Sequence, residues 1–97
     1  MIIVEVNFTV APNDHAQAIT CLMQEQPQMR ALSGNRATRV LADPSTEGAI
    51  TLLHQWDDLA ALDAYRAGPL FAAIGARLRP LMTGAPSTTV YEATPIG

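Results

Sequence analysis

The chain has 97 residues, of which 48% are hydrophobic and 15% are charged, and its formal net charge is −3. A chain of this length forms one domain, and it buries only roughly 60 to 65% of the surface that the unfolded chain exposes, so that association with a partner would add stability. The acidic balance leaves no basic patch for a phosphate backbone, which excludes nucleic acid as an expected partner.

The first predicted element is a strand over residues 2–10. Hydrophobic side chains occupy every second position, which is the period of a half-buried strand. They are Ile2, Val4, Val6, Phe8 and Val10. Glu5 and Asn7 interrupt the apolar run, and no positively charged segment precedes it. We therefore expect neither a signal peptide nor a membrane span, and we predict a cytoplasmic protein.

A helix is predicted to follow, from about residue 14 to Gly34. Asn13 or Asp14 can cap its first amide groups, and a glycine suits the left-handed position at a helix end. Pro27 would remove one helical hydrogen bond, so we expect the helix to kink or break there. The single cysteine, Cys21, lies within this helix and is predicted to be a small buried thiol.

Two strands are predicted next, over residues 35–43 and 49–56. The turn between them contains Pro, Ser and Gly, which makes a hairpin the simplest connection. Asp57 or Asp58 can cap the helix that follows, and this capping function also explains two adjacent acids at that place.

Glycine and proline divide the rest of the chain. The Gly68-Pro69 pair ends one helix, Pro80 ends another, and residues 87–94 form a last strand. The order strand, helix, strand, strand, helix in two pieces, strand is that of the α+β class. It predicts the ferredoxin-like split βαβ arrangement, a four-stranded antiparallel sheet with the helices on one face.

The second face of such a sheet has no helix to cover it. Apolar residues such as Ile3 and Leu53 are expected on that face if the more apolar set of side chains faces the helices. Apolar side chains left in water favour association, so we predict a homodimer that forms through the sheet face.

Three local patterns then resemble a known family. They are "VNFTVAPN", "RALSGNRATRVLADP" and "LLHQWDDLAALDAYRAGPLFAAI", which together extend over much of the chain. The chain resembles the antibiotic biosynthesis monooxygenase family of dimeric α+β barrel proteins. This resemblance implies the fold and the dimer, and it implies a monooxygenase reaction at the level of the family.

The haem-degrading branch of this family binds iron through a histidine four residues after the Phe of the helix-helix turn. The corresponding residue here is Gly75, which has no side chain to coordinate a metal. The two histidines and one cysteine also lack a metal-site spacing. We therefore expect no metal and no cofactor.

A second branch contains cofactor-independent oxygenases that act on aromatic polyketides. The resemblance implies a tryptophan in the pocket, which is Trp56 here. Its asparagine position is Leu52, and its arginine in the last helix has no clear counterpart, although Arg77 and Arg79 are nearby. Leu70 stands in "GPLF" where many members have a histidine. The polar groups of that branch are therefore only partly present.

The remaining candidate base is His54. Alternate strand residues share a face, so His54 should lie beside Leu52 and Trp56 on the side of the helices. Tyr65 and Phe71 can close over it, and Leu78 completes the expected substrate-binding set. We predict His54 and Trp56 as catalytic residues, with His54 as a general base that deprotonates a small aromatic ligand.

Each of these residues also has a structural interpretation. A histidine in a strand is often a hydrogen-bonded core residue, and Trp56, Tyr65 and Phe71 can serve as core packing alone. Two main functions therefore remain open, beside a third, the detoxification or sensing of reactive aldehydes or quinones, for which the sequence carries no signal. One is a cofactor-independent monooxygenase that oxidises an aromatic or polyketide-like molecule with O₂, and the other is a non-catalytic ligand-binding or dimerisation module of the same fold.

Overall fold

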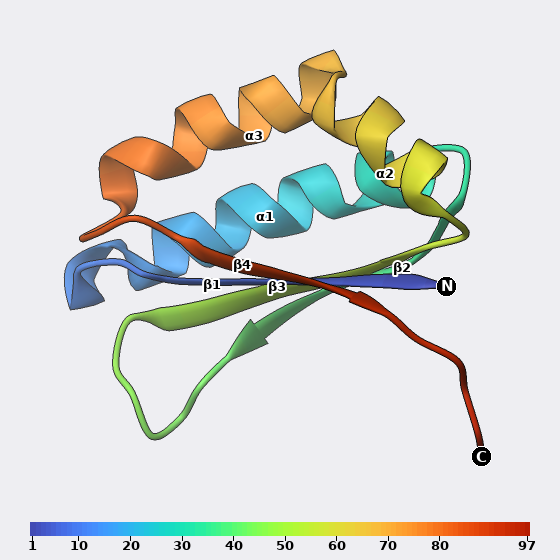
Figure 1. Cartoon of the computed structure of the whole chain (residues 1–97). Coiled ribbons are helices and arrows are strands. Elements are labelled where there is room, and N and C mark those ends of the chain that lie inside the picture. Colours follow the sequence, from blue (N-terminus) through green and yellow to red (C-terminus); the bar gives the residue numbers. More distant parts are fainter.

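The computed structural model describes all residues, 1–97, and Figure 1 shows two layers, a sheet with its helices on one side. The strands are β1 (Ile2–Thr9), β2 (Asn35–Ala42), β3 (Ala49–Trp56) and β4 (Ser87–Glu92). The helices are α1 (His15–Arg30), α2 (Leu59–Arg66) and α3 (Pro69–Leu78), with short 3₁₀ turns at Pro12–Asp14 and Arg79–Leu81.

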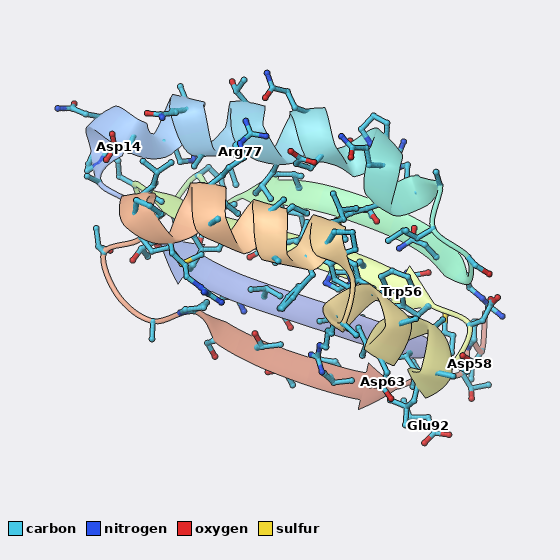
Figure 2. The ribbon with its side chains drawn as sticks, turned by 90° about the horizontal axis from the view of Figure 1, so that it is seen from above. Asp14, Trp56, Asp58, Asp63, Arg77 and Glu92 are labelled. Atoms are coloured by element: carbon cyan, nitrogen blue, oxygen red, sulfur yellow. The ribbon has the colours of Figure 1, made fainter.

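The sheet has the strand order β2-β3-β1-β4, and every neighbouring pair is antiparallel. This is the order of the split βαβ arrangement, so the ferredoxin-like fold predicted from the sequence is confirmed. Seen from above in Figure 2, β4 lies at the edge of the sheet next to α3, and α1 lies toward the opposite edge. All six residues of β4 are exposed.

The alternation in β1 and β3 determines what the sheet buries. In β3 every second residue from Ile50 to Trp56 is buried, and in β1 the residues Ile2, Val4 and Phe8 are buried. Trp56 is the largest side chain with no exposed surface, and it belongs to one continuous hydrophobic core. This core lies between the sheet and the helices, as the period of two predicted.

The structure corrects the expectation for Pro27. Helix α1 continues through this proline and ends at Arg30. Pro27 is exposed, so its ring lies at the surface, while Met29 beyond it is buried in the core. Gln26 and Arg30 also donate hydrogen bonds to the carbonyl oxygen of Thr38, at 2.6 and 3.3 Å. Packing and these two bonds hold the helix on both sides of the proline, which outweighs one lost hydrogen bond.

Both ends of α1 also differ from the sequence-based expectation. The 3₁₀ turn at Pro12–Asp14 leads into the helix, and Asp14 makes no side-chain capping bond. The helix ends before Gly34, which lies in the following turn with φ of +82°. A Cβ at Gly34 would come within 2.5 Å of Ala61 Cβ, so both the backbone angle and the contact with α2 require glycine here.

Only one of the two aspartates caps α2. The Asp58 side chain accepts a hydrogen bond from the backbone N–H of Ala61 at 2.9 Å. Asp57 instead pairs with Arg36, whose Nε lies 2.6 Å from a carboxylate oxygen. Both acids thus have structural partners at the surface. None of the helices has the length and apolar character needed to cross a membrane.

The face of the sheet opposite the helices is uncovered in the single chain. Ile3 and Leu53 are half-buried on this face, and Leu41 and Tyr91 are 43% and 47% exposed. Polar side chains lie between them, since Asn7 donates to Glu5 at 3.2 Å. The face is therefore mixed in character, and the homodimer remains a prediction.

Candidate functional site

A cavity of about 290 Å³ lies between the sheet and α3. Its floor is formed by the helix-facing residues of β1 and β3, and its walls come from α2, α3 and the segment that leads into β4. An apolar cavity of about 150 Å³ holds a benzene molecule, so this one is large enough for a molecule of about two fused rings. Most of the side chains around it are apolar.

Five of the six residues predicted for the site line this cavity. They are Leu52, His54, Tyr65, Phe71 and Leu78. The sixth, Trp56, does not line it, although it contacts two residues that do. Trp56 has no exposed surface and lies between the sheet and the helices, near the α2 end of the molecule in Figure 2.

The side chains of His54 and Trp56 are joined by a hydrogen bond. They share the inner face of β3, and the indole Nε1–H donates to Nδ1 of the imidazole at 2.6 Å. Both residues are buried, with 2% and 0% of their surface exposed. An indole N–H can only donate, so a buried tryptophan requires an acceptor, and Nδ1 supplies it.

Aromatic contacts hold this pair in place from the side of the helices. The Tyr65 ring stacks on the indole of Trp56 with a centroid distance of 5.2 Å and an interplanar angle of 23°. It also meets the rings of His54 and Phe71 edge to face, at 5.7 and 5.4 Å. Such contacts restrict the orientation of all four rings, so the imidazole is presented to the cavity in one geometry.

Burial controls the protonation of both titratable rings. Desolvation, and then the nearby positive charge of Arg66, lower the pKa of His54 from 6.5 to about 4. Desolvation raises the pKa of Tyr65 to about 12, against a smaller opposing effect of Arg66. At neutral pH the imidazole is therefore uncharged and the phenol keeps its proton.

The hydrogen bond from Trp56 also determines the tautomer of His54. A neutral imidazole carries one N–H, and since Nδ1 accepts a hydrogen bond, the proton must be on Nε2. Nε2 accepts or donates no hydrogen bond within the chain. It is not fully enclosed either, because Nδ2 of Asn35 is the only fully enclosed side-chain polar atom that lacks a partner. Nε2–H of His54 is therefore open to the cavity, to which it offers a donor and not a lone pair.

Sequence reasoning did not place two arginines, Arg66 and Arg79, at the cavity, yet both line it. The nearby Arg77 lies on another face of α3, where it binds Glu25 and donates to Gln24 at 2.8 Å (Figure 2). Arg79 comes four residues after Gly75. Gly75 aligns with the iron-binding histidine of the haem-degrading branch, so it marks the helix face that is expected to line a pocket. Side chains four residues apart on a helix lie one above the other, so this spacing could have placed Arg79 on the same face.

The cavity also uses strand residues that were predicted only as core. Val4, Val6 and Phe8 of β1 form part of its floor, and Thr88 of β4 lies at its edge. The alternation of β1 contained this information, since it placed those side chains on the inner face. No three His, Cys, Asp or Glu side chains come close enough together to hold a metal ion.

Comparison with known proteins places this geometry in a family. The family described as antibiotic biosynthesis monooxygenase matches residues 1–77. No functionally curated protein matches the chain.

Solved structures share the fold at low sequence identity. A crystal structure of an antibiotic biosynthesis monooxygenase is similar with a TM-score of 0.87 and 18% identity, over 98% of this chain and all of that one. A Deinococcus radiodurans protein proposed to be such an enzyme gives a TM-score of 0.90 at 24% identity, over 99% and 95% of the two chains. A Caulobacter crescentus protein proposed to be such an enzyme gives 0.90 at 22% identity, over 97% and 90%. Similarity at this level concerns the fold, and function has to be argued from the site.

Proposed function

The chain belongs to the antibiotic biosynthesis monooxygenase family, and we propose that it oxidises a small hydroxylated aromatic molecule with O₂ without a cofactor. The proposed substrate occupies the cavity beside His54, with its rings between the strands and α3. The size and apolar lining of the cavity support a ligand of about two rings.

The proposed reaction needs no external reductant. In an anthrone, a ring carbon that carries two hydrogens becomes a carbonyl carbon, and in a hydroxynaphthalene a ring C–H and the phenolic O–H supply the two hydrogens. One atom of O₂ forms the new C=O bond, and the other leaves as water with the two hydrogens. The electrons come from the substrate, whose anion is the species that reacts with O₂, so the task of the protein is to bind and stabilise that anion.

We propose His54 as a hydrogen-bond donor in this reaction, in place of the general base expected from the sequence. The observation that carries the proposal is the bond from Trp56 Nε1–H to Nδ1, which leaves Nε2–H as the group that faces the cavity. A donor at this point stabilises the oxyanion of an ionised phenol. The Tyr65 hydroxyl, protonated because burial raises its pKa to about 12, is a second donor on a residue that lines the cavity.

Trp56 is then a positioning residue and not a catalytic one. Trp56→Phe removes the donor to Nδ1, so the proton of the imidazole is free to occupy either nitrogen. In protein labelled with ¹⁵N-histidine, we expect wild-type His54 to show only the Nε2–H tautomer and Trp56→Phe to show a mixture. His15, the other histidine, is the internal control. A single unchanged tautomer in the variant would contradict the positioning role.

Oxygen consumption by purified, cofactor-free protein tests the proposed reaction. The panel contains anthrones and hydroxylated naphthalenes, and ¹⁸O₂ should place one labelled atom in the product. Two variants separate a donor from a base. His54→Gln keeps an N–H but has no basic nitrogen, and His54→Ala has neither.

A donor role predicts that His54→Gln keeps the rate within about tenfold of the wild type, while His54→Ala loses about 100-fold or more, as is typical when an oxyanion donor is removed. Equal losses in the two variants would support the base instead. No uptake by folded wild-type protein with any member of the panel would refute the proposed reaction.

One observation favours a second function, a non-catalytic ligand-binding module. The cavity has no carboxylate in its lining, and burial, with the Arg66 charge, lowers the pKa of its only histidine to about 4, so His54 is a weak base at neutral pH. Ligand binding without oxygen uptake would favour this module.

We also propose a homodimer formed through the open face of the sheet. The half-buried Ile3 and Leu53 and the exposed Leu41 and Tyr91 lie on strands that no helix covers, and a chain of 97 residues gains stability from such burial.

A further inference from the structure

Two charged side chains line the cavity, and both are arginines, Arg66 and Arg79. The two salt bridges of the chain are formed by Arg36 and Arg77 instead, so neither cavity arginine has an ion-pair partner within the chain, and both are exposed to solvent. The chain as a whole contains nine acidic and six basic residues. Both charged side chains at the cavity are thus positive although the protein is acidic overall, and positive charge attracts anions.

The Arg79 side chain packs over Gly75 at the cavity. Side chains at the end of a helix point back toward its start, and the Arg79 guanidinium lies against the glycine one turn earlier. A Cβ at Gly75 would be 3.6 Å from both Cζ and Nη2 of Arg79. Gly75 also lines the cavity, so this contact brings the Arg79 guanidinium to the cavity wall.

Arg66 lies at the end of α3 opposite to Arg79. It is the last residue of α2 and follows Tyr65, and its charge acts on both aromatic groups, since it lowers the pKa of His54 and opposes the rise in the pKa of Tyr65. From Pro69 at the start of α3 to Gly75, a rise of 1.5 Å per residue gives about 9 Å along the helix axis. The two positive charges therefore act at different points of the cavity.

The uncharged polar groups at the His54 end are also donors. Nε2–H of His54 and the hydroxyl of Tyr65 have no partner in the chain, and no carboxylate belongs to the cavity lining. A neutral hydrocarbon ligand would leave both donors at the His54 end without an acceptor, which costs free energy when they are desolvated, and it would gain nothing from the two solvent-exposed arginines. A ligand with acceptors at both ends satisfies all of them.

We propose that the substrate is an aromatic carboxylic acid, whose ring hydroxyl meets the His54 end and whose carboxylate is held by Arg79. This assignment rests on the proposed function for the reaction, but the binding itself can be tested separately. A carboxylate suits the guanidinium because two parallel N–H groups can bind its two oxygens.

A matched pair of ligands tests this. The probes are 6-hydroxy-2-naphthoate and its methyl ester, which differ in the negative charge, and calorimetric titration without oxygen measures their Kd values before any turnover. We expect the acid to bind about tenfold more tightly than the ester, the effect of one partly exposed charge-assisted bidentate pair. The ratio should fall as salt is added.

Arg79→Gln should reduce this ratio to about one and leave the Kd of the ester unchanged. Arg36→Gln is the matched control, since Arg36 forms an exposed ion pair with Asp57 outside the cavity, and it should keep the full ratio. Equal binding of acid and ester by the wild type would overturn the proposal, and so would an unchanged ratio in Arg79→Gln. Loss of both ligands in that variant would mean that Arg79 supports the cavity and not the carboxylate, which also overturns it.

Failure of this inference and failure of the proposed reaction give different results. Preference for the acid without oxygen uptake would leave the carboxylate site standing and refute the oxygenase. Oxygen uptake with neutral phenols, together with equal binding of acid and ester, would support the oxygenase and refute the carboxylate site.

Discussion

Burial of a neutral His54 should make the protein sensitive to mild acid. In the unfolded chain the imidazole takes up a proton near its ordinary pKa of 6.5, whereas in the folded chain desolvation and the Arg66 charge lower the pKa to about 4. Between these values the unfolded state binds one more proton than the folded state. The stabilising effect of the neutral histidine is therefore complete above pH 6.5 and is lost progressively as the pH falls toward 4.

The size of this effect follows from the two pKa values. Each pKa unit corresponds to 1.36 kcal/mol, and the imidazole has only 2% of its surface exposed, so the full loss is about 3 kcal/mol. Lowering the pH from 7.5 to 4.5 covers most of this range and should decrease the free energy of unfolding by roughly 2 to 3 kcal/mol. A small domain has only about 5 to 15 kcal/mol in total, so the change is easy to measure.

Urea unfolding at these two pH values, at one fixed protein concentration, measures the loss. Trp56 is the only tryptophan and is fully buried, so its fluorescence reports the transition. His54→Gln should abolish most of the pH dependence because an amide does not titrate, whatever its stability at pH 7.5. His15→Gln is the control and should keep the full pH dependence of the unfolding free energy. If His54→Gln loses as much stability in acid as the wild type, the reasoning is refuted.

Three further predictions concern single residues. Trp56→Phe leaves a void and removes the Nε1–H that donates to the imidazole, so it should lower the free energy of unfolding by about 2 to 4 kcal/mol, measured by urea denaturation at pH 7.5. Gly34→Ala places a Cβ within 2.5 Å of Ala61 Cβ at a φ of +82° and should lower the Tm, whereas Gly84→Ala, with open space around it, should not. Leu53→Glu on the open face should yield monomers in analytical ultracentrifugation, and an unchanged dimer would contradict association through this face.

The sequence by itself determined the order of the elements. The period of two in residues 2–10 and 49–56, the helical spacing between them, and the Gly68-Pro69 break are local signals, because each depends on neighbours within one or two turns of the chain. They predicted the split βαβ sheet, and they placed His54 and Leu52 on its inner face. Local periodicity is sufficient here because each element needs to bury only one face.

Tertiary structure decided the chemistry of the site. The hydrogen bond from Trp56 to His54 depends on side-chain orientations within the core, and the pKa values of His54 and Tyr65 depend on the water that packing excludes. Arg66 and Arg79 meet at one cavity because of how α3 lies on the sheet, which no local pattern specifies. The continuation of α1 through Pro27 has the same origin, since contacts with β2 and the core outweigh the local preference of proline.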